Sequence, residues 1–378
     1  MRRREMNTMT TTYLLMNKNR PLLSFYPQEV IDGFLELKED ECYVEQCLLP
    51  PCFSDIDTWV SNRNYAKHKE HLQCWLHEWG IDNAIGFLDI THALSLNDSL
   101  WVKKADSDLT WEQVNLYQNE FTDVVSVTAF ETGLHGLKLS TTSPEFTSEG
   151  SFEKCWTKEN DGIYLYKKGS SGFANAGLEA YSEFYASQLS AKVCKSFVPY
   201  DIVKFKKCIV SRCKMFTSEQ EGFVPIYKFL DSKKTYNFPK LIEFCRQYGC
   251  EEDFRRMIVL DAIIFNVDRH LGNFGFIVDN DTFEILRFAP VFDHNMALLA
   301  RAMQSDLDDF EHYYRTLGHK IDGEFVDVAR KLLTPAIRND VEALINFEFT
   351  EDTHYNLTSK RLEFLSKAVR NQVHGILT

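Results

Sequence analysis

The stretch Asn266-Val-Asp-Arg-His-Leu-Gly-Asn273 decides the fold that we expect for this chain, together with Ala289-Pro-Val-Phe-Asp293. Asp268 stands five residues before Asn273, and Asp293 follows a segment that predicts a β-hairpin. The two stretches therefore place two carboxylates and one amide on two neighbouring turns.

These three side chains suit phosphoryl transfer. One carboxylate can orient an incoming hydroxyl group and accept its proton, while carboxylate and amide oxygens hold the Mg²⁺ ion on the nucleotide phosphates. Asp, Asn and His also favour turns for reasons unrelated to catalysis, so a lone Asp-x₄-Asn match carries little weight. Here the context adds weight, because an amphipathic helix over 253–265 precedes the loop and an apolar-Pro-apolar segment leads to Asp293.

The helix predicted over 253–265 gives the loop a rigid base. Its packing face is defined by side chains at steps of three and four: Phe254, Met257, Ile258, Asp261, Ile264 and Phe265. Two strands within 274–288 flank the turn Asp279-Asn-Asp281, which is a hairpin signature. Further amphipathic helices are predicted towards the end of the chain, among them 325–333 and 361–376.

The segment 266–275 and the Ala-Pro-Val-Phe-Asp293 stretch resemble the HipA-like serine/threonine kinases of bacteria. More remotely, the Asp-Arg-His-x-x-Asn core is similar to that of the phosphatidylinositol kinases. The resemblance implies an α+β, two-lobed protein-kinase-like fold with the site between the lobes, here with an extra N-terminal α+β region. It also implies that ATP and Mg²⁺ serve to transfer the γ-phosphoryl group to a Ser or Thr of a protein.

Roles for the loop residues follow from this resemblance. Asp268 would be the catalytic base, and Asn273 and Asp293 would be the Mg²⁺ ligands. We place His270 with the catalytic residues, although it would brace the loop through hydrogen bonds, because Asp268 already occupies the position of the base. Arg269 could pair with a phosphorylated side chain or with an acidic neighbour.

Three regions are expected along the chain. An N-terminal region of unknown role covers 1–135, a kinase small lobe covers 136–230, and a helical large lobe covers 231–378. In the first region, a helix is predicted over 57–79. It carries four candidate metal ligands at steps of three, namely His68, His71, Cys74 and His77. Because steps of three drift around a helix, an aromatic-rich amphipathic helix is the favoured interpretation.

The small lobe opens with a phosphate-loop candidate. Gly150-Ser-Phe-Glu-Lys154 matches the Gly-x-x-x-Lys spacing of the HipA-like loop, so Gly150, Ser151 and Lys154 are assigned to the nucleotide. An ordinary polar hairpin turn is the alternative, since Gly and Ser are common turn residues. HipA-like kinases can be silenced by phosphorylation of a hydroxyl group in this loop, and here Thr147, Ser148 and Ser151 are all available.

Lys167 is the candidate that neutralises the phosphates. The run Ile163-Tyr-Leu-Tyr-Lys167 alternates like a strand, so Lys167 points to the same face as Ile163 and Leu165. A lysine on an apolar face is costly unless an anion meets it, and phosphate oxygens would do so. By the resemblance, these are the α- and β-phosphates of ATP.

Two further elements of the small lobe would serve the nucleotide. A helix over 177–192 supplies the glutamate that holds the strand lysine in a kinase. Glu183 is our choice, with Glu179 one turn earlier as the alternative, and either could instead be a solvated helix residue. The resemblance also places a hinge for the adenine ring near Cys213 and Met215.

Composition argues against several classes of partner. The 378 residues carry 42 basic and 55 acidic side chains, a net charge of −13, which disfavours broad binding of nucleic acid. The best basic candidate, Lys204-Phe-Lys-Lys207, alternates like a solvated strand face. The ten cysteines form no C-x-x-C pair, so reduced thiols are expected. The apolar run Tyr13-Leu-Leu-Met16 is too short for a secretory signal, so we expect a cytoplasmic protein without membrane contact.

Alternative functions remain open at this stage. A lipid kinase would share the Asp-Arg-His core, but an acidic chain is repelled by anionic membrane. A pseudokinase or binding module is disfavoured because Asp268, Asn273, Asp293 and Lys167 are all present. His294 follows Asp293, so the glycine of the eukaryotic metal-binding triplet is absent and its switch is not assumed. HipA-like kinases often pair with a helix-turn-helix antitoxin, and such a partner, like the protein substrate, lies beyond this sequence.

Overall fold

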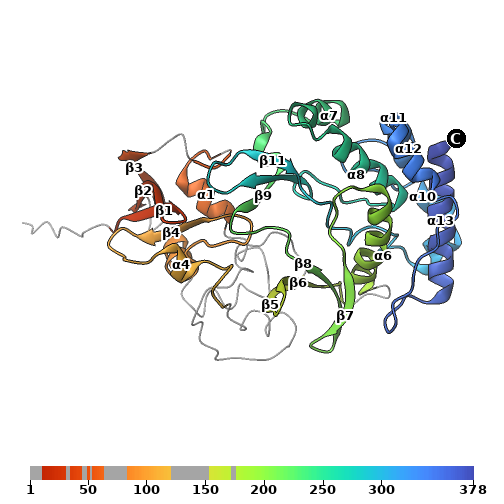
Figure 1. The fold of residues 1–378 in the computed structure, drawn as a ribbon, viewed down its shortest axis with the longest axis horizontal. Helices are drawn as coiled ribbons and strands as arrows, with labels where there is room; N and C mark the ends of the chain where they lie inside the picture. The colour runs from red at the N-terminus through yellow and green to blue at the C-terminus, as the bar shows by residue number, and fades with distance from the viewer. Residues whose placement is uncertain are drawn as a thin grey trace, which may run out of the picture. The chain divides into compact units, whose positions relative to one another are not determined.

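The computed structural model describes residues 11–30, 35–44, 49–51, 53–63, 83–120, 153–171 and 176–378 (Figure 1). The chain divides into two compact units. The first comprises Met1–Ser151, Thr217–Gly222 and Asp279–Glu284, and the second comprises Phe152–Phe216, Phe223–Val278 and Ile285–Thr378. Every described residue that we assign to the kinase site belongs to the second unit.

The first unit is built on a four-stranded antiparallel sheet in the order β3-β2-β1-β4. Its elements are β1 (Tyr13–Asn17), β2 (Arg20–Glu29), β3 (Leu35–Val44), α1 (Ile56–Arg63), α3 (Ala84–Thr91), β4 (Leu100–Lys104) and α4 (Trp111–Val114). Tyr13 and Leu15 alternate with the half-buried Leu14 and enter a core shared with Phe87 of α3. The side chain of Asn17 donates to the carbonyl of Asn280 at 2.7 Å, which ties the later segment to this unit.

Helix α1 coincides with the first part of the helix predicted over 57–79. Its last residue, Arg63, is buried and forms an ion pair with Asp98 at 2.6 Å. Residues 64–79 lie outside the described residues. The histidines and the cysteine proposed as weak metal candidates are therefore not placed.

The second unit begins with a four-stranded antiparallel sheet in the order β5-β6-β8-β7. Its strands are β5 (Lys154–Glu159), β6 (Gly162–Lys168), β7 (Asp201–Phe205) and β8 (Cys208–Lys214), and helix α6 (Leu178–Val193) packs on the sheet. Lys167 of β6 pairs with Ser211 of β8 across the ladder, so both side chains stand on one face. That face meets α6, and with it Glu183.

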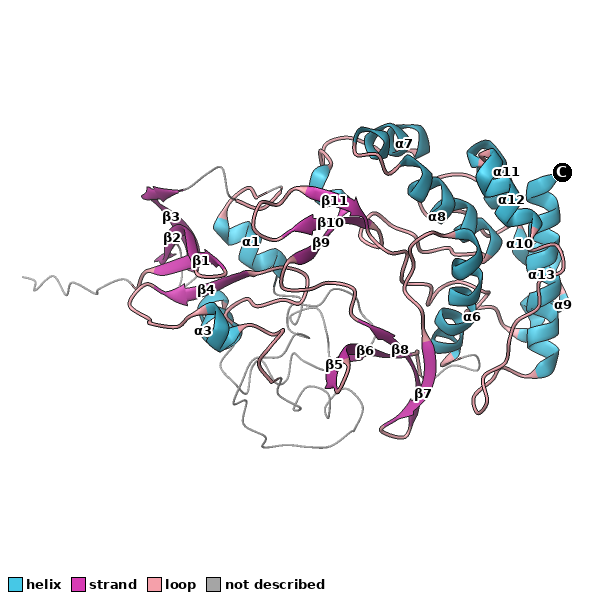
Figure 2. Ribbon diagram, in the orientation of Figure 1, coloured by secondary structure: helices cyan, strands magenta, loops and turns pink. Residues whose placement is uncertain are grey.

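The rest of the second unit is mostly helical (Figure 2). Its elements surround one large apolar core. A small antiparallel sheet has the order β11-β10-β9. Its elements and the helices are β9 (Glu221–Pro225), η4 (Ile226–Phe229), α7 (Phe238–Gln247), α8 (Glu251–Ile263), β10 (Gly275–Asp279), β11 (Ile285–Phe288), α9 (Gln304–Asp308), α10 (Phe310–Tyr314), α11 (Phe325–Leu332), α12 (Pro335–Glu342) and α13 (Ser359–Leu377). The predicted hairpin and the helices predicted over 325–333 and 361–376 are confirmed.

Helix α8 sets the base of the predicted catalytic loop. Its first turn carries Glu251, Glu252 and Asp253, which suit the positive end of the helix dipole. The following residues are almost all buried, and the helix stops before Phe265, whose φ of 55° is left-handed. The chain thus leaves a rigid, buried helix by a sharp turn directly into the loop.

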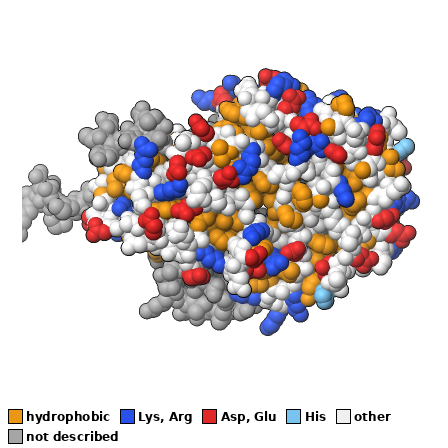
Figure 3. All heavy atoms as spheres, viewed as in Figure 1, with side chains coloured by type: hydrophobic (Ala, Val, Ile, Leu, Met, Phe, Trp, Pro, Cys, Tyr) orange, Lys and Arg blue, Asp and Glu red, His pale blue; other side chains and the backbone are white. Residues whose placement is uncertain are grey.

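The α+β class predicted from the sequence is confirmed by three antiparallel sheets and the helices that accompany them. Among the described residues, no helix combines the length and the apolar character that crossing a membrane demands. On the face shown in Figure 3, acidic and basic side chains of the described residues are interspersed, and neither sign forms a continuous patch.

Candidate active site

The predicted catalytic loop is fastened to the end of α8. The side chain of Asn266 donates to Asp261 Oδ1 at 2.8 Å, and its oxygen accepts from the backbone nitrogen of Asp268 at 3.1 Å. Asn266 is buried, so these bonds are shielded from water. An amide is the residue type that can donate and accept at once, and this explains how Asp268 is held at a defined place.

Within the loop, Asp268 and Asn273 are joined directly. The Asn273 side-chain nitrogen donates to the carbonyl of Asp268 at 3.1 Å, which leaves the amide oxygen of Asn273 as its other functional atom. The backbone nitrogen of His270 donates to the same carbonyl at 2.8 Å, and its ring nitrogen Nδ1 accepts from Gly272 at 3.0 Å. The loop is therefore a closed, hydrogen-bonded turn that includes all three predicted residues.

A second group of predicted residues meets around Lys167. Its ammonium lies 2.5 Å from Glu183 Oε1 and 2.9 Å from Asp293 Oδ1. Ser211, the cross-strand neighbour of Lys167, donates to the other oxygen of Glu183. The Asp293 side chain is 21% exposed against 12% for Lys167 and 1% for Glu183, so the cluster meets solvent on the side of Asp293.

The charges of this cluster are strongly perturbed. Burial by itself would lower the pKa of Lys167, but the carboxylates of Asp293 and Glu183 outweigh it and raise the pKa above its ordinary value. Burial also opposes ionisation of Asp293, yet Lys167 overrides it and lowers the pKa of Asp293 to about 2. For Glu183, burial outweighs the nearby ammonium, and its pKa is raised. One cation is thus shared by two carboxylates in a buried place.

Asp293 also has an unusual backbone. Its φ is 60°, in the left-handed region that L-residues other than glycine seldom adopt. Its backbone nitrogen donates to the hydroxyl of Tyr200 at 3.2 Å, and the preceding Val291 pairs with the 196–198 segment. Such strain clusters at functional sites, where the surrounding structure over-determines the conformation.

Arg269 has an acidic partner. Its guanidinium pairs with both oxygens of Asp261, at 2.9 and 3.1 Å, and this leaves it 1% exposed. Of the two roles predicted for Arg269, the acidic neighbour is the one observed. Its second arm donates to the carbonyls of Asn273 and Phe292, and Nη2 approaches His294 Nδ1 at 3.3 Å. Burial and this guanidinium hold the pKa of His294 well below its ordinary value.

Of the remaining candidates for nucleotide binding, one lies beside the Lys167 cluster, two lie outside the described residues, and one does not contact Lys167. Lys154 begins β5 directly opposite Lys167, and its charge helps to lower the pKa of Asp293. Gly150 and Ser151 lie outside the described residues, as do Thr147 and Ser148. Glu179, the alternative to Glu183, is buried but accepts from the backbone nitrogen of Ser170 at 3.2 Å instead of meeting Lys167.

The two hinge candidates lie on or next to β8. Cys213 is buried beside Leu165 and Phe216, and burial raises the pKa of its thiol to about 12. The backbone nitrogen of Met215 donates to the carbonyl of Ile163 at 2.8 Å, so this N–H group is engaged within the sheet. Cys213 and Met215 could therefore offer an adenine ring an apolar surface, but the backbone N–H group of Met215 is not free to donate to it.

Sequence reasoning missed several residues of the site. Asp261 was placed on the packing face of its helix, and a carboxylate on an otherwise apolar face was the available signal. Ser211 could have been found only from the strand register, which the sequence does not give. No sequence signal pointed to the hydroxyl of Tyr200, because its contact with Asp293 joins segments far apart in the chain.

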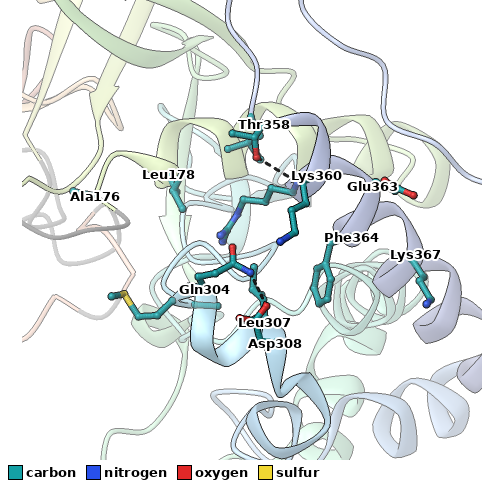
Figure 4. Close-up of a pocket in the computed structure, with 14 residues that line it drawn as sticks. Ala176, Leu178, Gln304, Leu307, Asp308, Thr358, Lys360, Glu363, Phe364 and Lys367 are labelled. Atoms are coloured by element: carbon teal, nitrogen blue, oxygen red, sulfur yellow. Dashed lines mark hydrogen bonds between the residues drawn. The ribbon is translucent and has the colours of Figure 1, made fainter.

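A separate cavity of about 570 Å³ lies in the same unit (Figure 4). Apolar Leu178, Leu307 and Phe364 line it together with Lys360 and Lys367. None of the predicted site residues is among its lining residues. The cavity therefore does not coincide with the predicted catalytic residues.

No family model matches the chain, and no curated protein matches its sequence. Among solved structures, the proinflammatory kinase CtkA of Helicobacter pylori has a TM-score of 0.46 and 19% identity, covering 61% of this chain and 92% of CtkA. The HipA structure from the Shewanella oneidensis MR-1 toxin–antitoxin system, a complex with HipB and operator DNA, has a TM-score of 0.49 and 10% identity, covering 97% of this chain and 99% of that chain. Since neither TM-score reaches 0.5, the site geometry must support any function on its own.

Proposed function

We propose that this protein is a kinase that uses ATP and Mg²⁺ and transfers the γ-phosphoryl group to a Ser or Thr of a protein substrate. The observation that carries the proposal is the meeting of Lys167, Glu183 and Asp293 in one buried cluster. The three residues come from β6, from α6 and from the turn after β11. Such a lysine–glutamate pair beside a metal-binding aspartate is the arrangement that a kinase requires.

The charge balance of the cluster supports an anionic ligand together with a cation. With both carboxylates ionised, these three side chains by themselves carry a surplus of one negative charge, and Arg269 and Lys154 are the further cations that act on Asp293. A divalent cation held at Asp293 would release Lys167 to meet phosphate oxygens. A purely structural ion pair would not need the second carboxylate, because buried charges are stable only when they are balanced.

The donor set fits Mg²⁺. Asp293 offers a carboxylate, and Asn273 offers its amide oxygen because its nitrogen is already bonded to the Asp268 carbonyl. Carboxylate and amide oxygens are the ligands that this hard ion prefers. When bound with ATP, Mg²⁺ neutralises the negative charge of the phosphates during transfer.

The residues of the chain would divide the remaining work. Glu183 holds Lys167 in place and is itself held by Ser211, so helix α6 fixes the phosphate-binding lysine. Asp268, anchored through Asn266, would orient the hydroxyl group of the substrate and take its proton. His270 would stiffen the loop through its bond from Gly272.

The test is transfer of the terminal phosphate of labelled ATP to protein in the presence of Mg²⁺. Asp268→Ala should lose label by about 10²- to 10⁴-fold, the usual contribution of a general base. Asp281→Ala is the matched control, because Asp281 is 62% exposed on the following hairpin. Label that survives in Asp268→Ala overturns the assignment of the base.

Two further measurements address the substrate. Phosphoamino-acid analysis of labelled protein should give phosphoserine or phosphothreonine, whereas label in lipid from added phosphatidylinositol vesicles would favour the lipid-kinase alternative. Phosphoproteomics after induced expression would identify the substrate. An antitoxin-type partner, as in the HipA–HipB complex, would be sought by purifying the expressed protein from its own cells.

A further inference from the structure

The Asp261–Arg269 ion pair uses nearly every hydrogen-bonding atom that it has. Nε and Nη2 of Arg269 reach the two oxygens of Asp261 at 2.9 and 3.1 Å. Nη1 donates to the carbonyls of Asn273 at 2.8 Å and of Phe292 at 2.6 Å. Both side chains are at most 1% exposed, so this saturation offsets the cost of burying two charges.

The two carbonyls bonded by Nη1 belong to the two metal-binding turns. Asn273 is itself a proposed Mg²⁺ ligand, and Phe292 immediately precedes Asp293, the other one. A single guanidinium nitrogen therefore joins the catalytic loop to the Asp293 turn. Because a planar guanidinium offers donors in a fixed geometry, it sets the distance between these turns in a way that a flexible ammonium cannot.

His294 extends the connection to α6. The hydroxyl of Ser190 donates to the Ala186 carbonyl at 3.0 Å, so it is left to accept from His294 Nε2 at 3.2 Å. His294 Nδ1 is then the acceptor that faces Arg269 at 3.3 Å. One tautomer of a neutral imidazole satisfies both contacts.

A second serine of α6 fastens the same turn. The hydroxyl of Ser182 lies 2.6 Å from the carbonyl of His294 and 2.8 Å from that of Ala297. Ser182 immediately precedes Glu183, which holds Lys167. Helices α6 and α8 pack against each other, as Figure 1 shows. The turn that contains Asp293 and His294 is therefore held by serines of α6 on one side and, through Arg269, by Asp261 of α8 on the other.

We propose that Arg269 is a positioning residue whose guanidinium fixes the separation of Asn273 and Asp293, with Asp261 and His294 holding the guanidinium in turn. The inference rests on the function proposed above, since it concerns the same site. It predicts that weakening Arg269 changes metal affinity and not only stability. A buried arginine with a merely structural role would change stability alone.

Arg256 provides a matched control. It stands on α8, is 5% exposed, and donates to the Val193 carbonyl and to Asp340, both at 2.6 Å. None of these partners belongs to the catalytic loop or to the Asp293 turn. Arg256→Lys and Arg269→Lys therefore each replace a buried guanidinium of the helical lobe by an ammonium. Only Arg269→Lys removes hydrogen bonds to the turns that carry the proposed metal ligands.

The experiment measures binding of Mn²⁺, a probe for Mg²⁺, by electron paramagnetic resonance in the presence of a non-hydrolysable ATP analogue. We expect Arg269→Lys to weaken Mn²⁺ binding by about 10- to 100-fold, as changes behind metal ligands usually do. Arg256→Lys should stay within about twofold of the wild type, because it shares no partner with the site. Melting temperatures by circular dichroism show the stability that each variant loses.

The outcomes separate this inference from the proposed function. Equal Mn²⁺ affinity in the two arginine variants overturns the positioning role while leaving the kinase proposal intact. Absence of Mn²⁺ binding by the wild type overturns both. Should Arg269→Lys fail to fold, Asp261→Asn, which keeps the shape of the carboxylate but not its charge, is judged by the same tenfold criterion.

Discussion

The second unit contains two buried clusters of charged side chains, and they differ in charge balance and in exposure. The Asp261–Arg269 pair is balanced, with one charge of each sign and nearly all of its donors occupied. The Lys167 cluster has two carboxylates for one ammonium and is more exposed on the side of Asp293. The difference supports the proposal that the Lys167 cluster, and not the Asp261–Arg269 pair, is the one that binds a charged ligand.

The balanced pair should be the more expensive to break. Asp261→Ala leaves a buried guanidinium without its carboxylate, so we expect a loss of about 3–5 kcal/mol in the free energy of unfolding. Urea denaturation monitored by circular dichroism measures it. Asp281→Ala, at an exposed ion pair with Lys18, should cost no more than about 1 kcal/mol.

In the Lys167 cluster, by contrast, removing one negative charge should have little effect on the free energy of unfolding. Glu183→Gln removes the surplus negative charge and leaves Lys167 paired with Asp293, so we expect the free energy of unfolding to change by no more than about 1 kcal/mol. A loss as large as that of Asp261→Ala would show that the two clusters do not differ as proposed.

We expect phosphoryl transfer to depend strongly on Asp293 of the Lys167 cluster. Asp293→Asn keeps the size of the side chain but removes the charge that would hold Mg²⁺, and we expect phosphoryl transfer to fall by about 10²- to 10³-fold. Labelled ATP measures the rate. Asp279→Asn, at the half-buried last residue of β10 whose carboxylate bonds with the backbone of the hairpin turn, is the control that should retain activity. Retained transfer in Asp293→Asn would contradict its role as a metal ligand.

The residues of the two clusters also differ in how well they could be predicted from the sequence. Lys167 could be selected from strand alternation, and Asp268, Asn273 and Asp293 from their spacing together with the resemblance to the HipA-like kinases. Glu183 was selected because a kinase needs a glutamate on that helix, with Glu179 as the alternative. The hairpin and the helices around them followed from the same periodicity. The fold class was therefore accessible without coordinates, and three of the selected residues, Lys167, Glu183 and Asp293, meet in the structure.

The supporting contacts were less accessible. Ser211, Tyr200 and His294 act through the register of a sheet and through loops far apart in sequence, and no local pattern encodes such pairings. The absence of a glycine after Asp293 was visible, but its reason was not. In the structure, the imidazole of His294 fills that place and bonds with Arg269 and Ser190.

Acid pH offers a milder way to probe the Lys167 cluster. The pKa of Asp293 is lowered to about 2 from an ordinary value of 3.8, so its ionised form stabilises the folded state. This stabilisation is complete above about pH 5 and is lost as the pH falls through about 2. We expect the difference in free energy of unfolding between wild type and Asp293→Asn, on the order of 2 kcal/mol, to shrink over that range. A difference that is constant with pH would mean that Asp293 is not stabilised by Lys167.

The smallest effect on catalysis is expected at Ser211. Its hydroxyl donates to Glu183, so Ser211→Ala removes one hydrogen bond to a carboxylate while Lys167 continues to pair with that residue. We expect a loss of about 1–2 kcal/mol in the free energy of unfolding and a few-fold increase in the KM for ATP, because Glu183 would hold Lys167 less firmly. Ser187→Ala is the control, because the Ser187 hydroxyl on helix α6 bonds only with the backbone groups of Phe184 and Tyr200 and with no charged side chain, and it should leave the KM unchanged. An unchanged KM in Ser211→Ala as well would show that Lys167 is positioned by the strand alone, and that the ion pair with α6 balances charge without orienting the lysine.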